Sequence, residues 1–307
     1  MEIFLSLFFK IIPLYVLIGI GYIGAKYFDI KRDSIAKVAI YFASPAIVFV
    51  GIQNADLSTN VIYFPIVFFL VSTFICLINL FFAQFLWKDS TKNLFAMASA
   101  NGNLGYFGIP VCIVLLGEES LPTAVAATFG LIVFEYTVGY YVLARSNYTV
   151  RESLSKIFKL PAIYAFILGL LTNSFDLTVP APISQTMDLM KGAYTPLGMM
   201  IIGLGLATVK LHHIDKKFIS FSLLNKFIVW LGISLFLVFL DTNYFHVFNE
   251  MIHKVFVIES ITPIAANTAA FASILNTHPE KASIAIFIST IVALVFIPLV
   301  LTSLSIF

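Results

Sequence analysis

The 307-residue sequence is 60% hydrophobic and only 11% charged, whereas soluble domains carry about 25% charged residues. This composition excludes an ordinary water-soluble domain, and the net charge of +2 gives no indication of nucleic-acid binding. The two cysteines, Cys76 and Cys112, lie in apolar surroundings without the spacing of a disulfide framework or a metal site. Lipid must therefore form part of the solvent around this chain.

A membrane-spanning helix needs roughly 20 apolar residues, and ten segments are candidates by that measure. Continuous apolar runs such as 62–80 differ from the alternating pattern of β-barrel strands. Glu2 precedes the first run without a basic region or a cleavage site, so we expect a retained helix rather than a signal peptide. We predict an all-α integral membrane protein with ten transmembrane helices, near residues 4–26, 35–53, 61–86, 92–116, 122–144, 160–175, 184–209, 217–240, 247–276 and 281–305.

Basic residues are concentrated in alternate loops between these segments. All Lys and Arg except Lys10, Lys191 and Lys254 fall in or next to the odd-numbered loops, and Lys226 is counted with that group. The positive-inside rule makes this side cytoplasmic. We therefore expect a multi-pass protein of the cell membrane with both termini on the non-cytoplasmic side.

The two halves of the chain show similar features in the same order. Five helices per half would enter the membrane from opposite sides, so the repeats are expected to be inverted, at 1–150 and 151–307. Inverted repeats are typical of secondary transporters, with the binding site at the repeat interface. The matched features are Pro13 and Gly21 with Pro161 and Gly169, Pro45 with Pro196, and a polar interruption in the fourth and ninth segments.

The fourth segment is interrupted by a cluster of Asn and Gly residues in the middle of the predicted membrane span. Glycine and asparagine favour unwinding, and unpaired backbone groups are tolerated at membrane depth only against protein or a water-filled cavity. We predict a broken helix and substrate contacts at Asn101, Gly102, Asn103, Leu104 and Gly105.

The ninth segment carries a second predicted break. Pro263 suits the first turn of a new helix, whose N–H groups and positive dipole end would then point at the cavity. Two such ends would bind a carboxylate, with substrate contacts at Pro263, Ile264, Asn267 and Thr268. The alternative is that both interruptions are simple kinks, but their matched positions favour a site.

Two carboxylates lie within predicted spans, Glu135 and Glu259. Ionisable residues inside a membrane are usually functional, so either could carry a coupling proton, and the alternative is a structural hydrogen bond to a neighbouring helix. The adjacent His212 and His213 cannot face one ligand from a helix. We expect no cofactor or metal, and a coupling ion of H+ or Na+.

The sequence resembles the auxin efflux carrier family, which includes bacterial malonate and malate carriers and plant PIN-type carriers. The resemblance extends over nearly the whole chain and lies in residues 12–22 with 43–46, 103–110, 203–206, and Pro263 with 276–279. It implies ten helices in two inverted repeats. Helices one, two, six and seven would form a scaffold, often dimeric, and helices three to five and eight to ten would form a mobile transport part.

The resemblance also implies roles for single residues. The broken helices would cross at Gly102 and Pro263, and Asn103 would lie beside the substrate carboxylate. Glu135 and Glu259 stand where PIN-type carriers have glutamine, which favours ion coupling here, and Ala162 replaces an asparagine of the plant auxin pocket. Hinges or helix breaks are expected at Pro45, Pro110, Pro196, Gly203 and Gly205.

The predicted function is secondary transport of a small organic anion by elevator-type alternating access, as a homodimer in lipid. Sodium-coupled symport is one alternative, and a membrane sensor is another, although the short loops offer no appended signalling domain. The absence of P-loop, HExxH and GxSxG motifs gives no support to an enzyme.

Overall fold

The computed structural model describes residues 2–54, 59–144, 161–207, 215–275 and 277–304. Within these ranges every regular element is a helix. The basic loops expected at 145–160 and 208–214, and the repeat boundary near residue 150, lie outside the described residues. The elements are α1 (Glu2–Phe28), α2 (Arg32–Val38), η1 (Ala39–Ala43), α3 (Ser44–Gln53), α4 (Thr59–Leu86), α5 (Thr91–Ala100), η2 (Leu104–Gly108), α6 (Ile109–Leu116), η3 (Glu118–Ser120), α7 (Leu121–Phe134), η4 (Glu135–Gly139), α8 (Tyr140–Ala144), α10 (Pro161–Ser174), α11 (Ala181–Leu206), α12 (Lys216–Leu224), η5 (Asn225–Val229), α13 (Trp230–Leu240), η6 (Asp241–Phe245), α14 (Glu250–Ser260), α15 (Asn267–Ile274) and α16 (Pro279–Ser303).

Seven helices of the described chain are long and apolar enough to cross a membrane. Three of them, Arg32–Gln53, Glu118–Ala144 and Lys216–Phe245, run through π-helical segments without interruption. The three other segments expected to span contain shorter helices: α5 with α6, α10, and α14 with α15. The structure thus supports an all-helical multi-pass membrane protein, and the count of ten spans stays a prediction.

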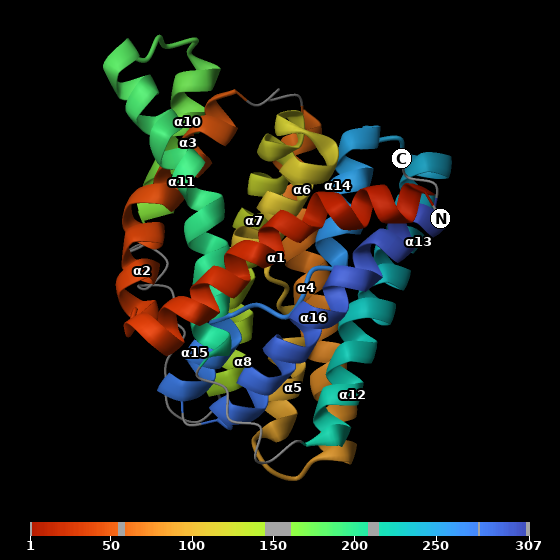
Figure 1. Cartoon of the computed structure of the whole chain (residues 1–307). Helices are drawn as coiled ribbons and strands as arrows, with labels where there is room; N and C mark the ends of the chain where they lie inside the picture. The colour runs from red at the N-terminus through yellow and green to blue at the C-terminus, as the bar shows by residue number, and fades with distance from the viewer. Residues whose placement is uncertain (1, 55–58, 145–160, 208–214, 276, 305–307) are drawn as a thin grey trace.

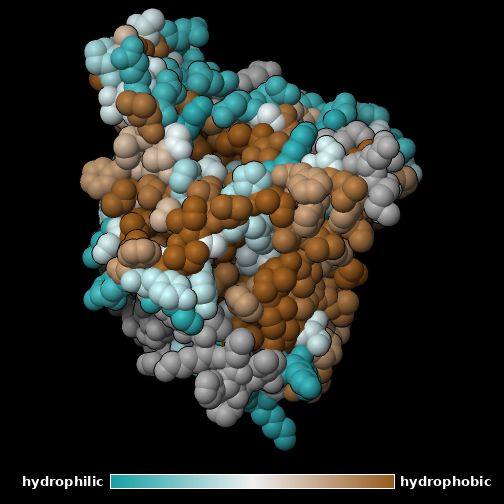
Figure 2. Space-filling model, viewed as in Figure 1, coloured by the Kyte–Doolittle hydropathy of each residue, from teal (hydrophilic) through white to brown (hydrophobic). Residues whose placement is uncertain are grey.

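The outer surface fits contact with lipid. Large apolar side chains are exposed along α1, α4 and α10, among them Phe9, Phe74 and Leu168. Figure 2 shows apolar surface over most of the visible face, with hydrophilic residues gathered at the upper edge and the lower tip. A water-soluble monomer rarely exposes so extended an apolar surface.

The helices form two packed groups (Figure 1). One group contains α1, α2, α3, α10 and α11, and the other contains α4 to α8 and α12 to α16. α1 also lies along α16, which joins the groups. The assignment of these groups to a scaffold and a transport part stays a prediction.

Close backbone contact holds α1 against α11. A side chain at Gly203 would overlap the carbonyl oxygen of Ile18, and one at Gly21 would overlap the carbonyl oxygen of Met200. Small residues allow membrane helices to approach in this way. Helix α11 continues through Pro196, Gly203 and Gly205 without a break, so Gly203 has a packing role there.

Loops predicted to share one side of the membrane lie next to each other. The Lys281 Nζ is 2.9 Å from the Asp215 Oδ2 and donates to the Thr91 Oγ1, and the Lys217 Nζ donates to the Leu86 carbonyl. On the other predicted side, the Lys191 Nζ is 3.1 Å from a Glu118 oxygen. These contacts agree with the predicted alternation of the loops.

Candidate functional site: a cavity beside two crossing helix breaks

Both predicted interruptions are unwound in the structure. The first lies between the end of α5 at Ala100 and the start of η2 at Leu104, and Asn101 is extended there. The second separates the end of α14 at Ser260 from the start of α15 at Asn267. Each break therefore leaves two half-helices whose ends lie inside the helical body.

The two breaks cross and complete each other's hydrogen bonds. Gly102 and Ile264 form an antiparallel bridge. The Asn103 N–H donates to the Pro263 carbonyl at 2.8 Å, and the Ala265 N–H donates to the Asn101 carbonyl at 3.0 Å. Unwound backbone inside a membrane needs such partners, because water is not there to supply them.

A cavity of about 130 Å³ opens beside this crossing. By the same measure one water needs roughly 10–15 Å³, so the cavity accommodates a small solute. It lies between the two helix groups. The lining residues of the first group are Ser44, Val48, Pro161, Ala162, Ile163 and Tyr194, and the other lining residues belong to the second. The break residues in its lining are Gly102, Asn103, Leu104, Gly105, Ala265, Ala266 and Asn267.

Glu135 connects both breaks at the wall of the cavity. Its side chain is buried, with 3% exposure, in the π-helical segment η4. One carboxylate oxygen accepts from the Asn101 Nδ2 at 2.7 Å and the other from the Asn267 Nδ2 at 3.3 Å. Asn101 also donates to the Thr268 hydroxyl at 3.2 Å. The predicted residues Asn101, Glu135, Asn267 and Thr268 therefore form one hydrogen-bonded group.

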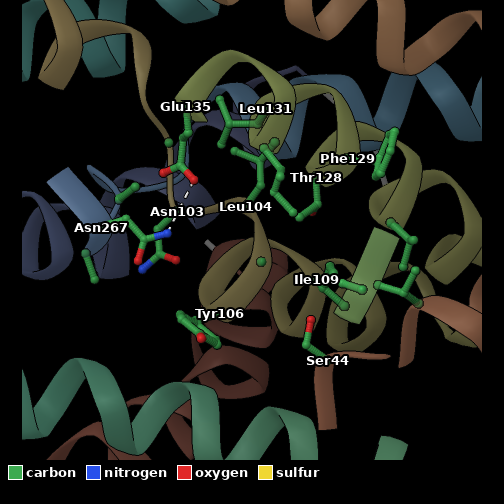
Figure 3. A pocket seen from close by; sticks show the side chains of 18 of the residues that line it. Ser44, Asn103, Leu104, Tyr106, Ile109, Thr128, Phe129, Leu131, Glu135 and Asn267 are labelled. Carbon is green, nitrogen blue, oxygen red and sulfur yellow. Dashed lines mark hydrogen bonds between the residues drawn. The ribbon is translucent and has the colours of Figure 1, made fainter. Parts of the chain in front are cut away.

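Asn103 offers the cavity a free donor. Its side chain is buried, and the Nδ2 has no hydrogen-bond partner within the part of the chain that the structure describes. Figure 3 shows Asn103, Asn267 and Glu135 pointing toward one another. An unsatisfied buried donor costs about 1–3 kcal/mol, so a ligand or water would be bound there favourably. The helix starting at Leu104 adds N–H groups and a positive dipole end.

Comparison with known proteins places this arrangement in a family. A sequence model described as membrane transport protein matches residues 6–301. The chain belongs to the membrane transport protein family. This match confirms the resemblance to the auxin efflux carriers and makes the protein a transporter rather than an enzyme.

Two archaeal relatives align over almost their full lengths. An uncharacterised transporter of Methanothermobacter thermautotrophicus is 28% identical over 305 residues, covering 97% of this chain and 96% of the relative. An uncharacterised transporter of Methanocaldococcus jannaschii is 26% identical over 305 residues, covering 92% of this chain and 94% of the relative. Both names describe transport and leave the substrate open.

Some predicted site residues of the transporter lie away from the cavity. Four residues support the crossing but are not part of the lining: Asn101, Pro263, Ile264 and Thr268. Glu259 lies elsewhere, packed so closely against Gly108 that a side chain there would overlap its carboxylate. The predicted hinges also lie outside the lining: Pro45 begins α3, Pro110 begins α6, and Pro196, Gly203 and Gly205 lie within α11.

Lys226 was placed wrongly by the sequence analysis. It was counted with the cytoplasmic loops, but the structure buries it completely, at 0% exposure, in the π-helical segment η5. Helix α12 begins at Lys216, and a helix rises about 1.5 Å per residue, so Lys226 lies well inside the span. The sequence did contain an indication of this burial, because a lysine inside an apolar run is rare in membrane helices and usually faces the protein interior.

Aromatic lining residues were also missed. Tyr106, Tyr136 and Tyr194 line the cavity, but apolar spans contain many aromatic residues and no spacing distinguishes these three. Tyr106 and Tyr194 approach each other with ring centroids 6.0 Å apart, which joins η2 to α11 across the two helix groups.

Proposed function

We propose that this transporter carries a small organic anion with a carboxylate group, bound in the cavity at the crossing. The observation that carries the proposal is the Asn103 amide, which has no partner among the described residues and lines a cavity of about 130 Å³ beside a helix start. A carboxylate accepts several N–H bonds at once. Malonate and malate are suitable first probes because they are small carboxylates.

Glu135 is the proposed proton carrier. Its two oxygens are held by amide donors from both breaks, so its charge influences both sides of the crossing. A proton on Glu135 would also remove the repulsion between its carboxylate and a bound anion. This arrangement supports the proposal that the anion is transported together with a proton.

Alternating access is proposed to work by an elevator movement of one helix group along the other. Support comes from the position of the cavity, whose walls belong to both groups. In this scheme α1, α2, α3, α10 and α11 form the scaffold, and the remaining helices move with the two breaks. The ten spans would form two inverted repeats, residues 1–150 and 151–307, with both termini outside the cytoplasm.

A homodimer is proposed to form through the scaffold group. Exposed apolar side chains of α10, Tyr164, Leu168 and Leu171 among them, offer a surface that either a second copy or lipid would cover. A dimer would hold the scaffolds still while the transport parts move.

Substitution of Asn103 tests the site. Asn103→Ala removes the free amide, and we expect malonate or malate binding to the purified protein to weaken by about tenfold or more, as measured by isothermal titration calorimetry. The matched control is Asn79→Ala, because Asn79 is also a buried asparagine but donates to its own helix at the Ile75 carbonyl. Equal affinity in wild type and Asn103→Ala would remove Asn103 from the site.

A further inference from the structure

A buried lysine lies directly behind the crossing. The Lys226 Nζ is 2.6 Å from the point where a side chain of Gly102 would begin, and the Thr262 hydroxyl is 2.8 Å from the same point. Gly102 itself lines the cavity. The ammonium group is therefore separated from the proposed anion site by little more than the Gly102 backbone.

This position is also where two half-helices end. Gly102 follows the end of α5 at Ala100, and Thr262 follows the end of α14 at Ser260. The carboxyl end of a helix carries a partial negative charge, and transporters with broken helices bind Na+ or H+ at such ends. Lys226 supplies a positive charge at this place from within the chain.

The groups around Lys226 fit a cation. Its Nζ lies 4.7 Å from the centre of the Trp230 ring and interacts electrostatically with Glu259. Among the described residues, the Nζ has no hydrogen-bond partner, and neither has the Glu259 Oε2. A buried carboxylate is unfavourable without a nearby opposite charge, and Lys226 is a buried cation that acts on Glu259 electrostatically without forming an ion pair in the described structure.

We propose that Lys226 is a built-in cation that holds the crossing together in the place of a bound sodium ion, so that anion binding by this transporter does not depend on sodium. The ammonium group balances the ends of α5 and α14, interacts electrostatically with Glu259, and attracts the anion from behind Gly102. The anion part of this statement rests on the proposed function, whereas the part about sodium does not.

The first experiment needs no substrate. The apparent melting temperature of the wild-type protein in detergent is measured in sodium chloride and in choline chloride at equal ionic strength, and we expect no difference. Lys226→Ala leaves the cation place empty, so its melting temperature should be lower and should rise in sodium chloride. Lys217→Ala, which removes a surface lysine bonded to the Leu86 carbonyl, is the matched control and should show no sodium response.

A sodium-specific rise for the wild type would overturn the proposal, and so would a Lys226→Ala protein that melts equally in both salts. If Lys226→Ala does not fold, the wild-type comparison still decides whether sodium is bound.

The second experiment measures malonate binding by wild type in the same two salts. The expected Kd values agree within about twofold, and tighter binding in sodium chloride by tenfold or more would contradict the proposal. Binding in neither salt for malonate or other small carboxylates would count against the proposed function, and the melting comparison would still decide the role of Lys226.

Discussion

At the scale of single residues, the site depends on amide groups around one carboxylate. Glu135 accepts hydrogen bonds from Asn101 and Asn267, one at each break. A change in its charge would therefore alter the hydrogen bonds at both breaks. Among the residues that the structure describes, the Asn103 amide nitrogen has no hydrogen-bond partner. In the proposed function, Glu135 would carry the proton and Asn103 would contact the anion.

Glu135→Gln tests the proposed role of Glu135. The amide cannot titrate and places a donor against the donors of Asn101 or Asn267. We therefore expect uptake of labelled malonate into proteoliposomes to lose its dependence on a pH gradient, while wild-type uptake changes with the gradient. Glu119→Gln, which neutralises an exposed carboxylate that is not part of the cavity lining, should keep the wild-type response. A pH response retained by Glu135→Gln would show that another group carries the proton.

The sequence indicated the Asn and Gly residues of the first break because polar residues in the middle of an apolar span are unusual. It could not indicate which way Glu259 and Lys226 face. Each is a single charged residue in a helical segment, Glu259 in α14 and Lys226 in η5. A rotation of the helix by one residue would point its side chain in another direction. The structure shows their positions: Lys226 lies against Gly102, and Glu259 lies against Gly108.

At the scale of elements, the helix breaks and the π-helical segments position the residues of the site. The breaks were predictable from Asn, Gly and Pro, whereas the π-helical segments η4 and η5 were not, although they carry Glu135 and Lys226. A π-helical segment inserts one extra residue into a turn and depends on tertiary packing, so the apolar pattern alone shows no signal for it.

The start of α12 provides a test at this scale. Asp215 caps the helix by accepting from the Phe218 N–H at 3.0 Å and lies 2.9 Å from the Lys281 ammonium. Burial favours the neutral carboxyl, but the Phe218 N–H and Lys281 outweigh it and hold the pKa of Asp215 below its usual value. The charged form therefore stabilises the fold above the ordinary pKa of about 4, and this stabilisation is lost as the pH falls through the lowered pKa.

Asp215→Ala should lower the apparent melting temperature at neutral pH, because loss of a helix cap costs about 1 kcal/mol. The difference from wild type should shrink below about pH 4. Asp188→Ala, at an exposed position in α11, is the control and should melt as wild type does. A melting temperature of Asp215→Ala equal to wild type at neutral pH would show that the cap does not stabilise α12.

At the scale of the whole molecule, the fold brings together segments far apart in the sequence. Residues 101–103 and 261–266 meet although more than half the chain separates them, and the bridge of Gly102 with Ile264 joins the two halves. The matched order of prolines and glycines indicated two similar halves, but not which faces would meet. The family resemblance supplied the expectation of a crossing, because composition and periodicity carry no information about contacts between distant helices.

Exchange of labelled malonate or malate across proteoliposome membranes tests the central claim most directly. Liposomes preloaded with the unlabelled anion should take up label when they contain wild type or Asn79→Ala, and should take up little more than protein-free liposomes when they contain Asn103→Ala. Exchange by Asn103→Ala at the wild-type rate would contradict binding at the crossing, and the absence of exchange of any small carboxylate by wild type would contradict the proposed carrier function.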